Sequence, residues 1–121
     1  MLTQLGKFLR KLRIDRGELL KDMADKLGMS SSMLSSIENN NRKPSSDFVS
    51  RVEGAYQLTA AQAEELARAA MGSLDTVAID MRHLSAGDQE LAFSFARRFS
   101  DLDAESKQNI MAILKGGNSQ Q

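Results

Sequence analysis

The chain has 121 residues, with 16 basic and 16 acidic side chains, no cysteine and a formal net charge of zero. The lack of cysteine excludes disulfides and thiolate metal sites, and no apolar run is long enough to span a membrane. We therefore expect a cytoplasmic protein without a membrane partner. The charge is unevenly distributed, because residues 1–57 hold ten basic and seven acidic side chains, whereas residues 58–121 hold six and nine. A basic first half favours nucleic acid as a partner of that half alone.

Apolar residues at helical spacing predict five helices in the first 72 residues. In chain order these helices cover residues 2–13, 19–27, 30 to about 39, 47 to about 56, and 60–71. Gly17 and Gly28 are typical of helix C-termini, and Ser30 and Thr59 are typical of N-caps. Pro44, the only proline, marks the turn before the fourth helix.

The pattern changes after residue 72. Val77, Ile79 and Met81 alternate with small or polar residues and predict a short strand. One or two further helices are expected, with Ser85 and Asp103 as their caps. The fold class is therefore mainly α. The expected parts are a five-helix domain over residues 1–72, a strand-and-helix module over 73–115, and a disordered tail over 116–121.

The spacing of residues 20–37 fits a helix-turn-helix, in which two short helices cross at a steep angle. Ala24 is small at the point where the third helix would cross the second. Gly28 suits the turn, because a positive φ strains a residue that carries a side chain. Ser30 offers an oxygen to the unpaired N–H groups at the start of the third helix. These constraints are met together, which makes the motif specific.

The stretch Arg13–Pro44 resembles the Xre/Cro family of helix-turn-helix regulators, which includes phage repressors and many antitoxins. The shared motifs are Leu-Arg-x-x-Arg-Gly, Met-Ala-x-x-Leu-Gly-Met-Ser, Leu-Ser-Ser-Ile-Glu-Asn and Arg-Lys-Pro. The likeness covers roughly residues 3–71 and implies a repressor-like five-helix domain. Its third helix would enter the major groove of double-stranded DNA.

The resemblance also implies which residues face DNA. Base contacts would come from the third helix, at Ser31, Ser32, Met33, Ser35 and Ser36. Phosphate contacts would come from the second helix and the loop after the third, at Lys21, Asn39, Asn40, Arg42 and Lys43. A serine hydroxyl donates or accepts a hydrogen bond, and methionine can pack on a thymine methyl. Without the resemblance, the serines would be read as a polar, solvent-facing side of a helix.

Two positions depart from the family pattern. Leu19 and Leu20 stand where a polar cap and a glutamine usually begin the second helix. The phosphate contact of that glutamine would then fall to Lys21 or to the N–H groups at the helix start. Asn40 replaces the usual glycine after the third helix, and asparagine also tolerates left-handed geometry.

Arg13 and Glu38 match a pair that links the first and third helices in this family. Arg13 has two possible roles, a phosphate contact and an ion pair with Glu38. We favour the structural ion pair, because an unpaired Glu38 beside DNA would repel the phosphates.

The second half of the chain is expected to bind another chain. The predicted strand at 76–81 has no partner strand in the sequence, and such an edge invites pairing. Pairing across a two-fold axis would produce a homodimer; an extended linker packed on helices is the alternative. Phe93, Phe95 and Phe99 add apolar bulk that a dimer interface, a bound protein or a core would cover.

The sequence thus predicts a sequence-specific DNA-binding transcriptional regulator, in the form of a dimeric repressor of a palindromic operator. The alternative is an antitoxin, which would mask a cognate toxin with its acidic second half and repress its own operon. No catalytic residue, cofactor or metal site is expected. His83 is the only histidine, and nothing at nucleophile spacing accompanies it.

Overall fold

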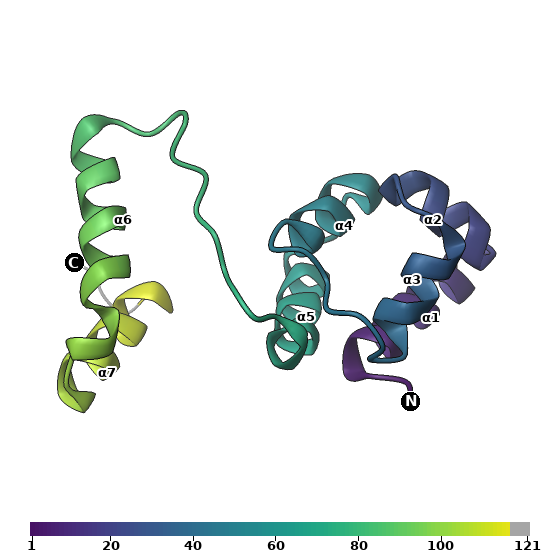
Figure 1. The fold of residues 1–121 in the computed structure, drawn as a ribbon, viewed down its shortest axis with the longest axis horizontal. Helices are drawn as coiled ribbons and strands as arrows, with labels where there is room; N and C mark the ends of the chain where they lie inside the picture. Colours follow the sequence, from purple (N-terminus) through teal and green to yellow (C-terminus); the bar gives the residue numbers. More distant parts are fainter. Residues whose placement is uncertain (117–121) are drawn as a thin grey trace. The chain divides into compact units, whose positions relative to one another are not determined.

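The computed structural model describes residues 1–116, and the regular structure in this part of the chain is entirely helical (Figure 1). The chain divides into two compact units, residues 1–78 and a second unit that begins at Ile79. The first unit holds α1 (Gln4–Arg16), α2 (Leu20–Leu27), α3 (Ser31–Glu38), α4 (Phe48–Tyr56), α5 (Ala60–Ala70) and the 3-10 helix η1 (Met71–Ser73). The second unit holds α6 (Ala86–Arg98), the 3-10 helix η2 (Phe99–Asp101) and α7 (Ala104–Leu114).

The helix ends of the first unit follow from local chemistry. Gly17 and Gly28 end α1 and α2 in left-handed geometry, with φ of 66° and 70°, a conformation that glycine adopts without strain. Ser30 caps α3 by accepting a hydrogen bond from the Met33 N–H at 3.0 Å. Thr59 caps α5 and receives a reciprocal contact from Gln62, the arrangement of a capping box. The five predicted helices are confirmed, and α1 runs on to Arg16.

A single apolar core lies inside the first unit, and every helix from α1 to α5 contributes to it. Its buried side chains are Leu5, Leu9, Leu12, Met23, Ala24, Leu27, Leu34, Ile37, Phe48, Val52, Tyr56, Leu66 and Ala70. The Leu34 and Ile37 side chains of α3 lie within this core. It continues past the expected domain boundary at residue 72, because Leu74 also packs against it. Ser73 is buried as well, so η1 belongs to the first unit.

The predicted strand at 76–81 is wrong. This segment is extended but forms no sheet, and residues 1–116 contain no strand. Val77 and Ile79 are exposed and Met81 is partly exposed. A strand exists only when its N–H and C=O groups are paired in a ladder, and no segment within residues 1–116 pairs with this one. The alternation of apolar and polar residues at 76–81 is equally consistent with an extended segment that is not paired in a sheet.

The second unit consists of two helices joined at η2. The expected caps are confirmed: Ser85 accepts from the Asp88 N–H at 3.1 Å, and Asp103 accepts from the Ser106 N–H at 2.7 Å. None of residues 79–116 is buried. The expected tail at 116–121 lies outside the described residues except for Gly116, which forms a turn after α7.

Candidate DNA interface

The turn between α2 and α3 is tight and hydrogen-bonded to the end of α2. Gly28 and Met29 donate to the Asp25 and Ala24 carbonyls at 3.2 and 3.0 Å, so two carbonyls of the last turn of α2 have partners. Ala24 is buried, and a larger side chain there would hold α2 and α3 apart. Ser30 then starts α3 at once. These residues fix the angle between the two helices, as the sequence predicts.

The α3 helix has a buried side and a polar side. Leu34, Ile37 and Glu38 are buried. At 100° per residue, Ser32, Ser35 and Ser36 fall on the opposite side; Ser32 is exposed and the other two are partly exposed. Ser31, also partly exposed in the first turn, lies next to Glu38 around the helix, at the edge of the buried side. The exposed side of α3 is therefore a row of short hydroxyl side chains.

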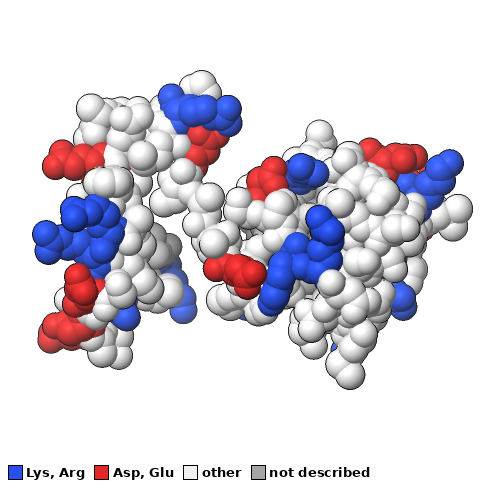
Figure 2. All heavy atoms as spheres, in the orientation of Figure 1, with Lys and Arg blue, Asp and Glu red and all other residues white. Residues whose placement is uncertain are grey.

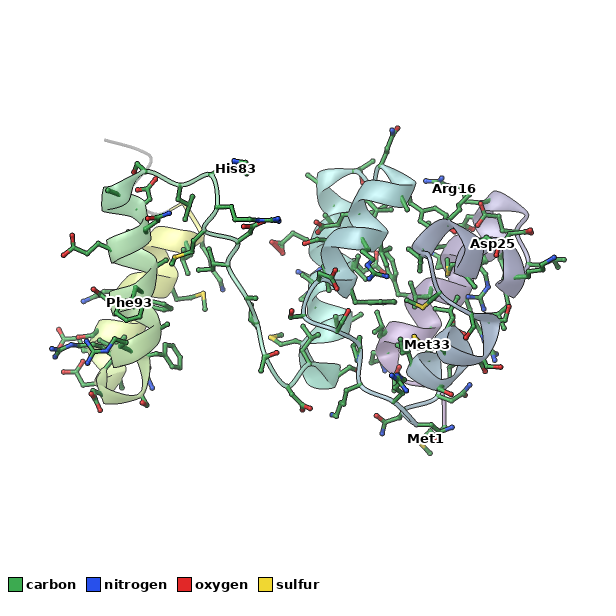
Figure 3. All side chains as sticks on the ribbon, turned by 45° about the horizontal axis from the view of Figure 1, so that its top comes forward. Met1, Arg16, Asp25, Met33, His83 and Phe93 are labelled. Carbon is green, nitrogen blue, oxygen red and sulfur yellow. The ribbon has the colours of Figure 1, made fainter. Side chains whose placement is uncertain are left out.

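Met33 differs from the serines because it lies at the edge of the buried side. Its side chain is partly buried and packs against the core; Figure 3 labels it on α3. Only part of the thioether is open to solvent. It borders the serine row without being a member of it.

Arg13 and Glu38 form a buried ion pair between α1 and α3. They are 8% and 2% exposed, and the guanidinium meets both carboxylate oxygens, at 2.5 and 3.3 Å. Arg13 also donates to the Met23 sulfur at 3.3 Å. Arg10 approaches the same carboxylate at 4.0 Å and is itself more than half exposed. The charge of Glu38 is thus compensated inside the protein.

The start of the chain anchors the end of α3, a contact that our sequence analysis did not anticipate. The Thr3 N–H and hydroxyl both donate to the Glu38 carbonyl, at 2.9 and 3.1 Å. Gly6 faces the same carbonyl, and a Cβ at this position would lie closer to the Glu38 carbonyl oxygen than real Cβ atoms come to any neighbour. Because that oxygen belongs to the backbone, the packing of α1 on α3 would have to shift. A glycine within an otherwise regular helix is the signal in the sequence.

The loop after α3 is shaped by asparagines. Asn40 has φ of 66°, the left-handed geometry expected for it. The Asn39 side-chain amide donates to the Ser35 carbonyl at 2.9 Å, and the Asn41 N–H donates to the Ser36 carbonyl at 2.8 Å. Asn39 is therefore engaged in capping α3, whereas Asn40 is exposed.

Arg42 and Lys43 follow on the same loop, and both are exposed. Lys43 lies 3.9 Å from the Asp75 carboxylate, with both side chains largely in solvent. An exposed pair of this kind contributes about 0–1 kcal/mol, so the ammonium can leave Asp75 at little cost. Within residues 1–116, Arg42 takes part in no salt bridge.

The N-terminus of α2 is not a simple anion-binding site, because an acidic side chain lies there. The Asp22 carboxylate accepts a hydrogen bond from the Leu19 N–H at 2.9 Å and brings a negative charge to the helix start. Leu19 is exposed and makes no side-chain cap. Lys21 is exposed in the first turn and is the cation at this helix start.

Three polar side chains meet at the corner between α1 and α2, and we call Glu18, Lys26 and Tyr56 the polar lock. The buried Tyr56 hydroxyl donates to the Glu18 carboxylate at 2.5 Å, and Lys26 pairs with the same carboxylate. The Lys26 hydrogen bond, followed by that of Tyr56, lowers the pKa of Glu18. Burial, reinforced by the Glu18 hydrogen bond, raises the pKa of Tyr56. Arg16 donates to the Tyr56 carbonyl at 3.1 Å, so α4 is also tied to the end of α1.

Basic and acidic side chains are interspersed over the face shown in Figure 2. On that face, attraction for an anionic partner would come from individual unpaired cations, because no continuous basic surface is visible there. Within residues 1–116, no group of three His, Cys, Asp or Glu side chains is arranged to hold a metal ion. His83 lies in the segment before α6 (Figure 3). No helix described here is long and apolar enough to cross a membrane.

Comparison with known proteins agrees with this geometry. A family model described as "Helix-turn-helix" matches residues 9–62, a stretch that runs from within α1 to the start of α5. The N-terminal domain belongs to the Xre/Cro-type helix-turn-helix family. No curated protein and no solved structure matches the chain. The helix-turn-helix domain makes this protein a DNA-binding transcriptional regulator.

Proposed function

We propose that this protein represses transcription by binding a palindromic operator as a homodimer, with α3 of each copy in the major groove. The observation that carries the proposal is the division of α3 into two sides. Its buried side is held by the core and by the Arg13–Glu38 ion pair, whereas its exposed side carries the serine row. A helix held this firmly can present its side chains to base edges in a fixed orientation.

In this proposal, base edges are contacted by Ser31, Ser32, Ser35 and Ser36, with Met33 reaching a thymine methyl from the edge of the row. Phosphates are contacted by Lys21, Asn40, Arg42 and Lys43, which are exposed, and by the backbone around Asn39. Phosphate contacts position the domain on the duplex, and base contacts specify the sequence. Lys43 would exchange Asp75 for a phosphate on binding.

The decisive experiment is selection of bound duplexes from randomised DNA with the full-length protein. We expect a consensus of two inverted half-sites about one helical turn apart, because a two-fold dimer places its two recognition helices at that separation. Recovery of no consensus, with uniform weak binding to all duplexes, would refute sequence-specific repression. A consensus with a single half-site would refute the dimeric mode of binding.

An antitoxin is the second candidate function. It is supported by the exposed apolar side chains of the second unit, which suit a protein partner. In that case a small toxin would be encoded beside this chain, and co-expression with this protein would abolish its toxicity. A neighbouring reading frame without toxic effect would leave the repressor as the better proposal.

A further inference from the structure

A groove lies between α1 and α5 in the first unit, and we call it the α1–α5 groove. Its volume is about 600 Å³, within the range of about 300–1,000 Å³ that small-molecule sites occupy. Its lining comes from α1 and the residue that caps it, the loop after α3, α5 and η1. No residue of α3 lines it, so the groove is separate from the proposed base contacts.

Two lysines of α1 line the groove. Lys7 and Lys11 are four residues apart and therefore share a face of the helix; both are exposed. Within residues 1–116, neither side chain makes a salt bridge or a hydrogen bond. Arg68 also lines the groove, but it pairs with Glu64 on its own helix. The two lysines are therefore the cations that an anion in the groove would meet.

Ser73 supplies a recessed hydroxyl to the same groove. The residue is 8% exposed, and within residues 1–116 its side chain makes no hydrogen bond. In this part of the chain, no solvent-inaccessible polar side-chain atom lacks a hydrogen-bond partner. The Ser73 hydroxyl must therefore be accessible, and the groove is the opening that it lines. A ligand there would gain a hydrogen bond that the protein leaves unmade.

An aromatic ring and a carboxylate complete the lining that concerns us. Phe8 is partly buried and packs against the core, so part of its ring is open to the groove. Glu65 is exposed on α5 and forms no salt bridge within residues 1–116, although it lines the groove together with Lys11. An ionised carboxylate only accepts hydrogen bonds. The groove thus suits a ligand with an anionic group, a ring and a hydrogen-bond donor.

We propose that the α1–α5 groove binds a small organic anion of this kind, a phosphate or carboxylate compound, and that this ligand weakens operator binding. Its anionic group lies against Lys7 and Lys11, and its donor against Glu65. A DNA duplex is a poorer occupant, because its phosphates offer Glu65 no donor and are repelled by it. The regulatory part of the proposal rests on the proposed function, whereas the ligand site does not.

Two residues of the lining connect the groove to the DNA interface. Thr3 holds the end of α3 through the Glu38 carbonyl, and Asn40 belongs to the loop that we propose contacts phosphate. An anion in the groove neutralises the two lysines and brings negative charge toward Asn40. The phosphates of the operator are then repelled, so the ligand should lower the affinity for DNA.

The first test is titration of the isotope-labelled full-length protein, followed by its backbone amide signals. The probes are O-phosphotyrosine and p-carboxyphenylalanine, which carry a phosphate and a carboxylate on the same frame, so their comparison shows which group is preferred. Tyrosine is the control without an anionic group on the ring. Amides of residues 3–11 and 65–73 should shift with a Kd of roughly 0.1–1 mM for the preferred probe, as expected for a ligand of this size. Tyrosine should bind much more weakly.

Variants locate the site. The double variant Lys7→Gln/Lys11→Gln and the single variant Ser73→Ala should each raise this Kd about fivefold, through loss of ion pairs and of a hydrogen bond. Ser73→Ala should leave urea stability unchanged, because the hydroxyl has no partner in the protein. Lys115→Gln is the matched control, since Lys115 is exposed after α7. No saturable shift with either probe, or an equal effect of Lys115→Gln, would refute the site.

Operator binding tests the regulatory part separately. A saturating concentration of the preferred probe should lower the operator affinity of wild type severalfold, and that of the double lysine variant much less. Unchanged affinity with an occupied groove would refute the regulation but not the site. If the double variant without probe flattened the salt dependence of DNA binding by about 1.8 units, the lysines would contact phosphates, which would refute a small ligand. If no duplex is bound sequence-specifically, the repressor proposal fails and the ligand site stands on the titration.

Discussion

At the scale of single residues, the proposed base contacts of α3 come from unusually short side chains. One hydroxyl makes one hydrogen bond to a base edge, whereas a bidentate pair from Arg or Asn discriminates by about 1–3 kcal/mol. Ser32 is the most exposed member of the row, and Ser36 is its neighbour on the same side. Specificity should therefore be spread over several weak contacts rather than concentrated in one.

Ser32→Ala and Ser36→Ala should each change the preferred operator at one base position. The expected loss on the parental operator is about 1 kcal/mol, the low end of the cost of a lost base contact. The measurement is a repeat of the selection from randomised DNA, with Ser94→Ala, an exposed serine on α6, as control. If both α3 variants returned the parental consensus at parental affinity, bases would be read by Ser31, Met33 or DNA shape.

Arg42→Ala should weaken specific and non-specific DNA binding about equally. Loss of one phosphate contact should flatten the slope of log affinity against log salt concentration by about 0.9. Fluorescence anisotropy at several salt concentrations measures this slope, and Arg68→Ala on α5 is the control with the same charge change. An unchanged slope would remove Arg42 from the interface.

Sequence reasoning succeeded at residues whose role is local. The caps at Ser30, Thr59 and Asp103 depend on the next three residues only, so the sequence was sufficient to predict them. It could not reveal that Asn39 is engaged with the Ser35 carbonyl or that Lys43 lies beside Asp75. The second contact joins residues that are distant along the chain, and only the packed structure brings them together.

At the scale of elements, the close approach of α1 to α3 depends on Gly6. Gly6→Ala should destabilise the domain by about 1–3 kcal/mol, because the added methyl overlaps the Glu38 carbonyl group. Gly54→Ala is the matched control, since Gly54 lies within α4 with open space around its Cβ position. That variant should gain about 0.4–1 kcal/mol. Urea denaturation of both variants measures the difference, and equal effects would contradict this packing.

The polar lock between α1, α2 and α4 predicts a pH dependence of stability. The folded-state pKa of Glu18 is lowered, whereas an unfolded Glu titrates near 4.3. Its contribution is therefore fully present above about pH 4.3 and is lost as the pH falls through the lowered folded-state pKa. Urea denaturation between pH 7 and 3 should show wild type and Glu18→Gln converging at the acidic end. Parallel curves would exclude Glu18 as a source of the dependence.

The failure of the predicted strand has the opposite cause from the success of the helices. A helix satisfies its own backbone, so residues 60–70 carry nearly all the information that α5 needs. A strand is completed by another strand, and the alternation at 76–81 contained no information on whether one exists. The two C-terminal helices were expected, but the absence of buried residues in them was not, because burial depends on what lies opposite.

At the scale of the whole molecule, every buried residue among residues 1–116 lies in the first unit. Residues 1–78 alone should therefore fold with the cooperativity of the full domain and bind a single half-site as the full chain does. They should bind the complete operator about 10²-fold more weakly, because the two half-sites are no longer bound by linked domains. Titration of both duplexes measures this, and equal affinity of the short and full chains for the complete operator would refute dimer-linked binding.

The two-sided construction of α3 has a consequence for how such a regulator diverges. The contacts that anchor the helix come from Leu34, Ile37 and Glu38. None of these contacts involves the hydroxyl of Ser32, which is exposed. Substitutions there change neither the core nor the buried ion pair and cost the fold little. If α3 contacts bases as proposed, one copy of a duplicated gene can therefore acquire a new operator through a few changes at exposed serines while its stability is preserved. DNA preference would then evolve separately from the maintenance of the fold.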